Sequence, residues 1–122
     1  MDALGLIAVA LAVAVAGGFG AVLRLFLSRW GGYLPWGILL ANSLASLLAG
    51  FLVWAIPNAV ASAIVITGFM GGLSTFSSWA AATAEYWATK QRMRMILNWG
   101  LNLLLPMICG MVGVGFGSLL LN

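Results

Sequence analysis

The side chains with the clearest chemical potential in this sequence gather in one segment, residues 67–78. Its twelve positions hold three glycines and then a group of hydroxyl side chains: Ser74, Thr75, Ser77 and Ser78. The adjacent Gly71 and Gly72 weaken helix propensity, and Ser and Thr offer backbone groups other hydrogen-bond partners. The segment therefore favours either a flexible, glycine-packed helix or an interrupted helix whose freed carbonyl oxygens face protein, water or a cation such as Na⁺.

Asn42 is the second candidate for chemistry. It lies in an apolar stretch whose other polar side chains are Ser43 and Ser46. An amide in apolar surroundings is costly unless it is paired, so Asn42 either bonds a neighbouring helix or donates an N–H to a permeant species. Asn98 and Asn102, four residues apart, are expected to form hydrogen bonds locally or across helices.

Most enzyme chemistry is excluded by the residues that are absent or rare. The chain has no His, two acidic residues and one cysteine, Cys109. It therefore lacks an imidazole base and an ordinary zinc site, and it cannot form an intrachain disulfide. We expect a protein that is not an enzyme.

The composition points to a membrane as the surroundings of these residues. Hydrophobic residues make up 64% of the 122 residues, charged residues make up 6%, and the mean hydropathy is +1.14. A soluble domain carries about 25% charged residues, because it must cover its surface with them. A water-soluble globular fold is therefore close to excluded.

Three long runs of the sequence carry no charge: 3–23, 30–84 and 95–122. A membrane helix needs about 20 mostly apolar residues, so the middle run is long enough for two helices, and Pro57-Asn58 divides it. We predict an all-α membrane protein with a single transmembrane domain over residues 1–122. Its four helices are expected at about 3–28, 34–56, 59–88 and 95–121, with the third broken in mid-membrane. Four such helices make a thin bundle, so we expect an oligomer.

The basic residues fall at two connections only, which the predicted topology places on one side of the membrane. They are Arg24, Arg29, Lys90, Arg92 and Arg94. The positive-inside rule then predicts that loops 29–33 and 89–94 are cytoplasmic. Because the sequence pI of about 9.8 depends on so few charges, it does not indicate nucleic-acid binding.

Three motifs in order resemble one family. The first is Gly17-x-x-Gly20-Ala21-x-x-Arg24-x-x-x-Ser28, and the second is Gly37 with Asn42, Ser46 and Gly50. The third and strongest is Gly68-Phe69-x-Gly71-Gly72-Leu73-Ser74-Thr75-Phe76-Ser77. Over about residues 15–85 the chain resembles the small bacterial fluoride channels (Fluc, also called CrcB).

The resemblance implies a passive channel in the plasma (inner) membrane of a prokaryote that exports fluoride and so lowers its cytoplasmic concentration. It implies an antiparallel dimer of two subunits that cross the membrane in opposite directions, with two pores. It also implies a structural Na⁺ at the dimer interface, held by backbone carbonyls that map to Gly71 and Ser74. Arg24 and Thr75 are expected to support the broken helix.

The family's pore maps onto five residues of this chain: Asn42, Phe76, Ser77, Ser78 and Trp79. The sequence departs from the family pattern at three positions. Trp79 stands where the family has a second Phe, Ala80 replaces a Ser, and Ala82 replaces a frequent Glu. A tryptophan at this position could tighten, reorient or block the pore.

Two further hypotheses remain open. Five basic residues on one side against none on the other favour one insertion orientation. The partner would then be a homologous subunit of opposite charge bias, and this chain would be a one-pore or non-conducting subunit.

The alternatives of another class are a small multidrug antiporter and a membrane assembly subunit. The antiporter needs a membrane-embedded carboxylate, whereas Glu85, the only Glu, lies near a predicted helix end.

Overall fold

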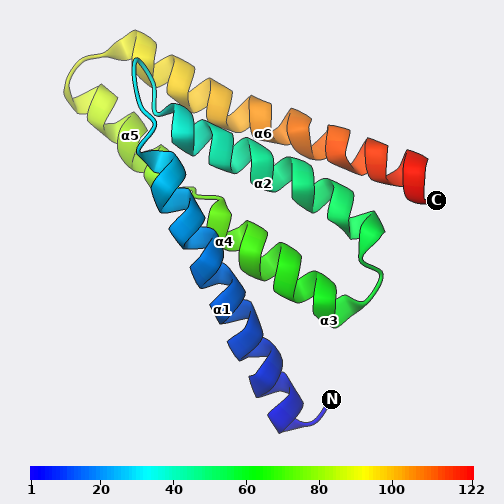
Figure 1. Ribbon diagram of the computed structural model, residues 1–122. Helices are drawn as coiled ribbons and strands as arrows, with labels where there is room; N and C mark the ends of the chain where they lie inside the picture. The colour runs from blue at the N-terminus through cyan, green and yellow to red at the C-terminus, as the bar shows by residue number, and fades with distance from the viewer.

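The computed structural model describes residues 1–122 and contains only helices, which confirms the all-α prediction (Figure 1). Four helical segments are long and apolar enough to cross a membrane. Three of them are continuous: α1 (Ala3–Ser28), α2 (Trp36–Ala55) and α6 (Arg92–Leu121). The remaining one, residues Ala59–Ala88, is divided into α3 (Ala59–Ser62), η1 (Ala63–Met70), α4 (Gly71–Leu73) and α5 (Ser77–Ala88).

The observed helix ends differ from the expected ones at the connections. Helix α2 begins at Trp36 rather than 34, directly after Pro35, whose backbone is not helical. Helix α6 begins at Arg92, three residues before the expected start at 95, because two basic side chains at a membrane surface do not interrupt a helix. Lys90 makes the tight turn before it, with a positive φ of 58°.

The third span is interrupted, but not at its glycine pair. Residues 63–70 wind as a π-helix, and Gly71 and Gly72 continue in helical conformation. The chain leaves the helix at Ser74, with φ −75° and ψ 155°, and helix resumes at Ser77. The glycines serve close packing instead, because a Cβ on Gly72 would collide with the backbone of Gly17 in α1.

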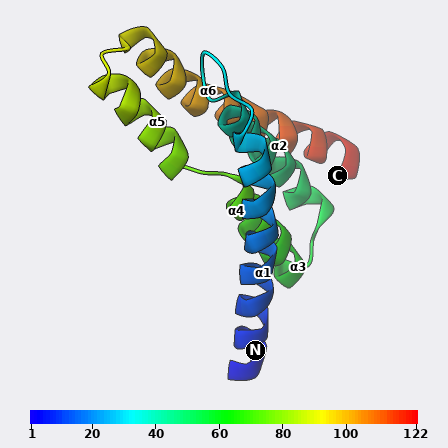
Figure 2. The same cartoon turned by 60° about the vertical axis from the view of Figure 1, so that its left-hand side comes forward.

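The helices form two packed layers that meet near the break. Helix α2 packs along α6, while α1 crosses η1 and α4, and both views agree on this arrangement (Figures 1 and 2). Helix α5 turns away after the break and packs against α6. Glycines again allow the close approach, since a Cβ on Gly113 of α6 would collide with the carbonyl of Leu47 in α2.

The buried core is small and lies beside the break. Ala41, Ala45, Met70 and Leu73 form its apolar cluster, and Leu73 and Asn98 are the largest fully buried side chains. Most other apolar side chains point outward, and only 6% of the apolar window of α1 is buried. These exposed apolar surfaces suit lipid or another protein rather than water.

The first and third connections lie at the same end of the molecule (Figure 1). The guanidinium carbon of Arg94 lies 4.5 Å from the centre of the Tyr33 ring, so the two connections touch. The basic residues of both connections therefore share one end, as the predicted topology requires.

Candidate functional site

Asn42 of α2 clamps the backbone where the third span is interrupted. The Thr75 N–H donates to Asn42 Oδ1 at 2.6 Å, and Asn42 Nδ2 donates to the Thr75 carbonyl at 3.1 Å. Both partners are buried, with 7% of each residue exposed. The side-chain amide thus replaces the helical partners that Thr75 has lost, which meets the requirement that buried backbone groups be satisfied.

The second N–H of Asn42 is also occupied. It donates to Asn102 Oδ1 of α6 at 3.1 Å. Of the two possibilities left open for Asn42, bonding to neighbouring segments is therefore present in this structure. An anion can take a hydrogen bond from Asn42 only by replacing either the Thr75 carbonyl or the Asn102 amide oxygen.

Three hydroxyl groups gather at the start of α5. Thr75 Oγ1 accepts a hydrogen bond from the Ser78 N–H at 3.1 Å and donates to Ser78 Oγ at 3.2 Å. It also lies 3.2 Å from Ser77 Oγ. With Thr75 as the donor to Ser78, the Ser78 hydroxyl hydrogen has no partner in the chain. The first turn of α5 thus presents a hydroxyl donor beside free backbone N–H groups, an arrangement that favours an anion.

Phe76 and Trp79 meet at this point. Their ring centres lie 5.2 Å apart and the planes are nearly perpendicular, at 89°. Phe76 is 72% exposed, and the indole Nε1 of Trp79 is buried without a hydrogen-bond partner. Because Phe76 is largely exposed, part of its positive ring edge is open to an electron-rich neighbour.

Two hollows adjoin the pair of rings. One, of about 200 Å³, is lined by the polar residues Asn42, Ser46, Ser74, Thr75 and Asn102 together with Phe76, Trp79 and Pro106. The other, of about 490 Å³, is largely apolar and is lined by Phe76, Trp79, Ala80, Thr83, Ala84, Trp87, Met95 and Trp99. Phe76 and Trp79 line both hollows, so these two rings stand between the polar surface of the break and the apolar surface beside α5.

The carbonyl oxygens of Gly71 and Ser74 have partners within the chain. Arg24 Nη1 donates to the Ser74 oxygen at 3.1 Å, and the Ser74 hydroxyl donates to the Gly71 oxygen at 3.3 Å. Both residues line one hollow of about 200 Å³ together with Ser46. Carbonyls are hard donors that suit Na⁺, and each oxygen keeps a second lone pair, so the donor chemistry fits the ion. Two carbonyls do not surround a cation, however, so a second chain would have to supply the rest.

Asn98 and Asn102 are the polar residues to which the sequence alone assigns no function. They are buried, with 1% and 6% exposed. Asn102 Nδ2 donates to the Asn98 amide oxygen at 3.1 Å, and Asn98 Nδ2 donates to Thr83 Oγ1 at 3.0 Å. The expected local and cross-helix bonds are both confirmed. The signal in the sequence is two amides four residues apart within an uncharged span, but the sequence does not show that they reach Asn42.

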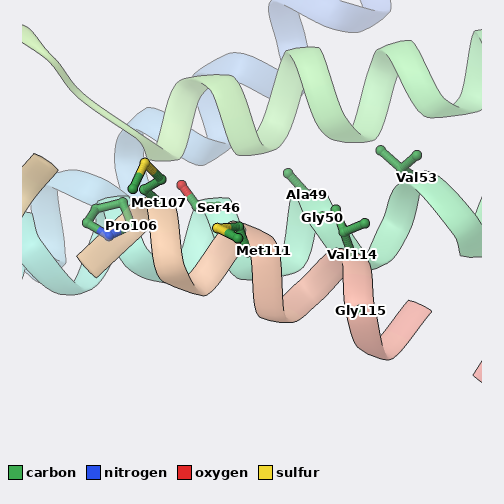
Figure 3. A pocket seen from close by; sticks show the side chains of 10 residues that line it. Ser46, Ala49, Gly50, Val53, Pro106, Met107, Met111, Val114 and Gly115 are labelled. Carbon is green, nitrogen blue, oxygen red and sulfur yellow. The ribbon is translucent and has the colours of Figure 1, made fainter. Parts of the chain in front are cut away.

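The largest groove lies between α2 and α6 (Figure 3). It measures about 720 Å³, and small residues and methionines line it, among them Ala49, Gly50, Met107 and Met111. Ser46 is the one side chain in its lining that carries a hydrogen-bond donor. The groove therefore suits apolar groups and offers little to an ion.

Comparison with known proteins identifies the family. The family model described as "CrcB-like protein, Camphor Resistance (CrcB)" matches residues 11–117. The chain belongs to the CrcB family. It is 36% identical to the fluoride-specific ion channel FluC of Sulfurovum sp., over 85% of this chain and 89% of that one. A FluC of Clostridium perfringens (strain 13) is 37% identical, over 81% and 88% of the two chains.

A third relative gives the same result. The fluoride-specific ion channel FluC of Legionella pneumophila (strain Lens) is 34% identical, over 72% of this CrcB-family chain and 73% of its own length. The relatives are named as ion channels, so the chain belongs to a channel family and is not an enzyme. Together with four apolar spans, this makes it a multi-pass membrane protein.

Proposed function

We propose that this chain forms a fluoride-selective channel that lets fluoride leave the cytoplasm passively. The observation that carries the proposal is the break at Ser74–Phe76, which Asn42 clamps and which places hydroxyl groups and ring edges together. The names of the relatives, all fluoride-specific ion channels, support the same ion.

The chemistry of these residues suits a small anion that holds its water tightly. The free hydroxyl hydrogen of Ser78 replaces part of the hydration shell, and Ser77 and the Asn42 amide add to it by exchanging a partner within the chain for the anion. The edges of the Phe76 and Trp79 rings attract an anion without a fixed cation that would trap it. Conduction needs sites that are strong enough to admit the ion and weak enough to release it, and such neutral donors provide them.

The proposal includes a second subunit in antiparallel orientation and a structural Na⁺ between the two. The carbonyls of Gly71 and Ser74 would hold the ion, and a second chain would complete its ligands. When bound, Na⁺ would hold the two breaks against each other. Arg24 supports the break by donating to Ser74, and Thr75 supports it through its bonds to Asn42. The exposed apolar faces of α1 and of the groove between α2 and α6 leave room for this partner and for lipid.

The proposed location is the inner membrane of a prokaryote, with the basic loops 29–33 and 89–94 in the cytoplasm. The shared end of the first and third connections supports this orientation. Because Arg24 reaches the mid-span carbonyl of Ser74, it does not count toward the loops. Four basic residues then remain at this end, namely Arg29, Lys90, Arg92 and Arg94, against none at the other.

This imbalance favours a second candidate, a one-pore or non-conducting subunit of a heterodimer. An antiparallel homodimer requires the same chain to insert in both directions, which four basic residues against none oppose. The replacements at Trp79, Ala80 and Ala82 accord with one degenerate pore. A drug antiporter is disfavoured because Glu85 is exposed near the end of α5. An assembly subunit would not need the clamp between Asn42 and Thr75.

Efflux from proteoliposomes tests the function. Vesicles loaded with potassium fluoride and carrying the purified dimer should release fluoride, recorded with a fluoride electrode, and chloride-loaded vesicles should release far less. The recording is made with this chain alone and then with a homologous subunit from the same organism. Flux from the chain alone supports the two-pore channel, and flux from the mixture alone supports the heterodimer. No flux from either would contradict the channel.

A further inference from the structure

A continuous series of hydrogen bonds links the break to α5 through two other helices. It starts at the Thr75 N–H, which donates to Asn42. Asn42 donates to Asn102, and Asn102 donates to Asn98. Asn98 donates to the Thr83 hydroxyl, which donates in turn to the Trp79 carbonyl at 2.8 Å. Every donor in this series points the same way, and we call these residues the amide relay.

The direction of the relay fixes which end of the Asn42 amide faces the break. If that amide flipped, its oxygen would face the Thr75 carbonyl and the Asn102 oxygen, both now 3.1 Å from the nitrogen. Two acceptors would then meet at each contact, and the Thr75 N–H would lose its partner. The orientation of Asn102 is fixed in the same way by its two bonds to Asn98, at 3.1 and 3.3 Å.

We propose that Asn102, held by Asn98, is a positioning residue that orients the Asn42 amide for fluoride passage. This inference rests on the proposed channel function, because it gives α6 a role in setting the donors of the pore. A leucine at 102 would fill a similar volume but could neither accept from Asn42 nor donate to Asn98. The relay is buried, and bonds in such a series strengthen one another, so the loss of one member weakens the others.

The first test removes single members of the relay. Asn102→Leu and Asn98→Leu should each lower fluoride efflux about tenfold, the effect expected when a buried hydrogen-bond partner is lost. Ser118→Ala is the matched control on α6, because the Ser118 hydroxyl bonds only the nearby Gly115 carbonyl. Size-exclusion chromatography checks that each variant remains a dimer.

The second test uses pH to change the protonation of a single side chain within one assembled variant. In Asn102→Asp, a protonated carboxyl can accept from Asn42 and donate to Asn98, whereas a carboxylate cannot donate. Efflux of this variant should therefore be low near pH 8 and should recover several-fold near pH 5.5, relative to the parent at each pH. The other charged residues on the helices around position 102 are Arg24 at the break, Glu85 on α5, and Arg92 and Arg94 on α6, whereas α2 carries none. Efflux of the unsubstituted protein at each pH corrects for any effect of pH on these residues.

The outcomes separate the two proposals. A conducting parent whose flux is unchanged by Asn102→Leu would overturn the relay and leave the channel intact. An equal loss of efflux in Asn102→Leu and in Asn102→Asp at both pH values would also overturn it. The defect would then come from the altered packing at position 102 and not from the hydrogen bonds. A parent that does not conduct, alone or with its homologous subunit, would overturn the channel and the relay together. If Asn102→Leu fails to assemble, the two pH values of Asn102→Asp decide the question.

Discussion

At the scale of single residues, the site is built from neutral donors whose partners are mostly within the chain. Asn42 has both N–H groups engaged, while Phe76 is largely exposed and free to meet an ion. The indole nitrogen of Trp79, by contrast, is buried without a partner. Of these three side chains Phe76 is the one least engaged within the chain, so its replacement is the most direct probe of the ion path.

Replacing Phe76 with isoleucine removes the ring edge and keeps an apolar side chain of similar volume. Since a ring edge contributes roughly 0.5–1.5 kcal/mol to an interaction, we expect fluoride efflux to fall by about two- to tenfold while the assembly remains intact. Phe116→Ile, on the exposed side of α6, is the control and should leave efflux unchanged. Normal efflux in Phe76→Ile would place the path elsewhere.

Substitutions at two adjacent residues of α2 distinguish the effect of the hydrogen bonds made by Asn42 from the effect of burying a polar side chain. Asn42→Leu removes three hydrogen bonds and leaves the Thr75 backbone unpaired, so the protein should lose roughly 1–3 kcal/mol of stability. Ser43 is buried equally well, but its hydroxyl has no partner, so Ser43→Ala should cost about 0.5 kcal/mol or less. Thermal unfolding in detergent measures both. A costly Ser43→Ala would show that this hydroxyl is bonded in the assembly.

At the scale of elements, the interrupted third span joins the two helical layers. Charge and hydropathy could predict the number of spans, and the glycines and hydroxyl residues of 67–78 could predict a break among them. The sequence could not locate the break at Ser74, since the preference of Gly71 and Gly72 for loops was overridden by their packing on α1. Nor could it show the reach of Asn102 to Asn42, which depends on how α2 and α6 are aligned.

A pair of glycines tests this packing. At Gly72 an added Cβ would collide with the Gly17 backbone, whereas at Gly18 nothing lies within 4 Å. We expect Gly72→Ala to destabilise the protein by roughly 1–3 kcal/mol, because neighbouring backbone must move. Gly18→Ala should be neutral or stabilising by up to about 1 kcal/mol, since Ala favours helix. Equal unfolding temperatures for the two variants would mean that α1 does not approach α4 this closely.

At the scale of the whole molecule, charge and exposed apolar surface both point to assembly. All the basic loop residues share one end, which predicts a single insertion orientation. Protease-cleavable tags at both termini of the chain in native membranes should be cut from outside the cell only. Cleavage of equal fractions from each side would remove the argument for a homologous partner and favour a homodimer.

The first turns of α1 extend beyond the end of α3, as both views show (Figures 1 and 2). Within the chain, the close backbone approaches to α1 lie between Val13 and Leu27, against η1, α4 and Gly37 of α2, so the attachment covers the C-terminal half of α1. A helix held only over its C-terminal half leaves a wedge beside its first turns that acyl chains or a neighbouring copy must fill. The angle of α1 should therefore respond to the thickness and unsaturation of the surrounding bilayer.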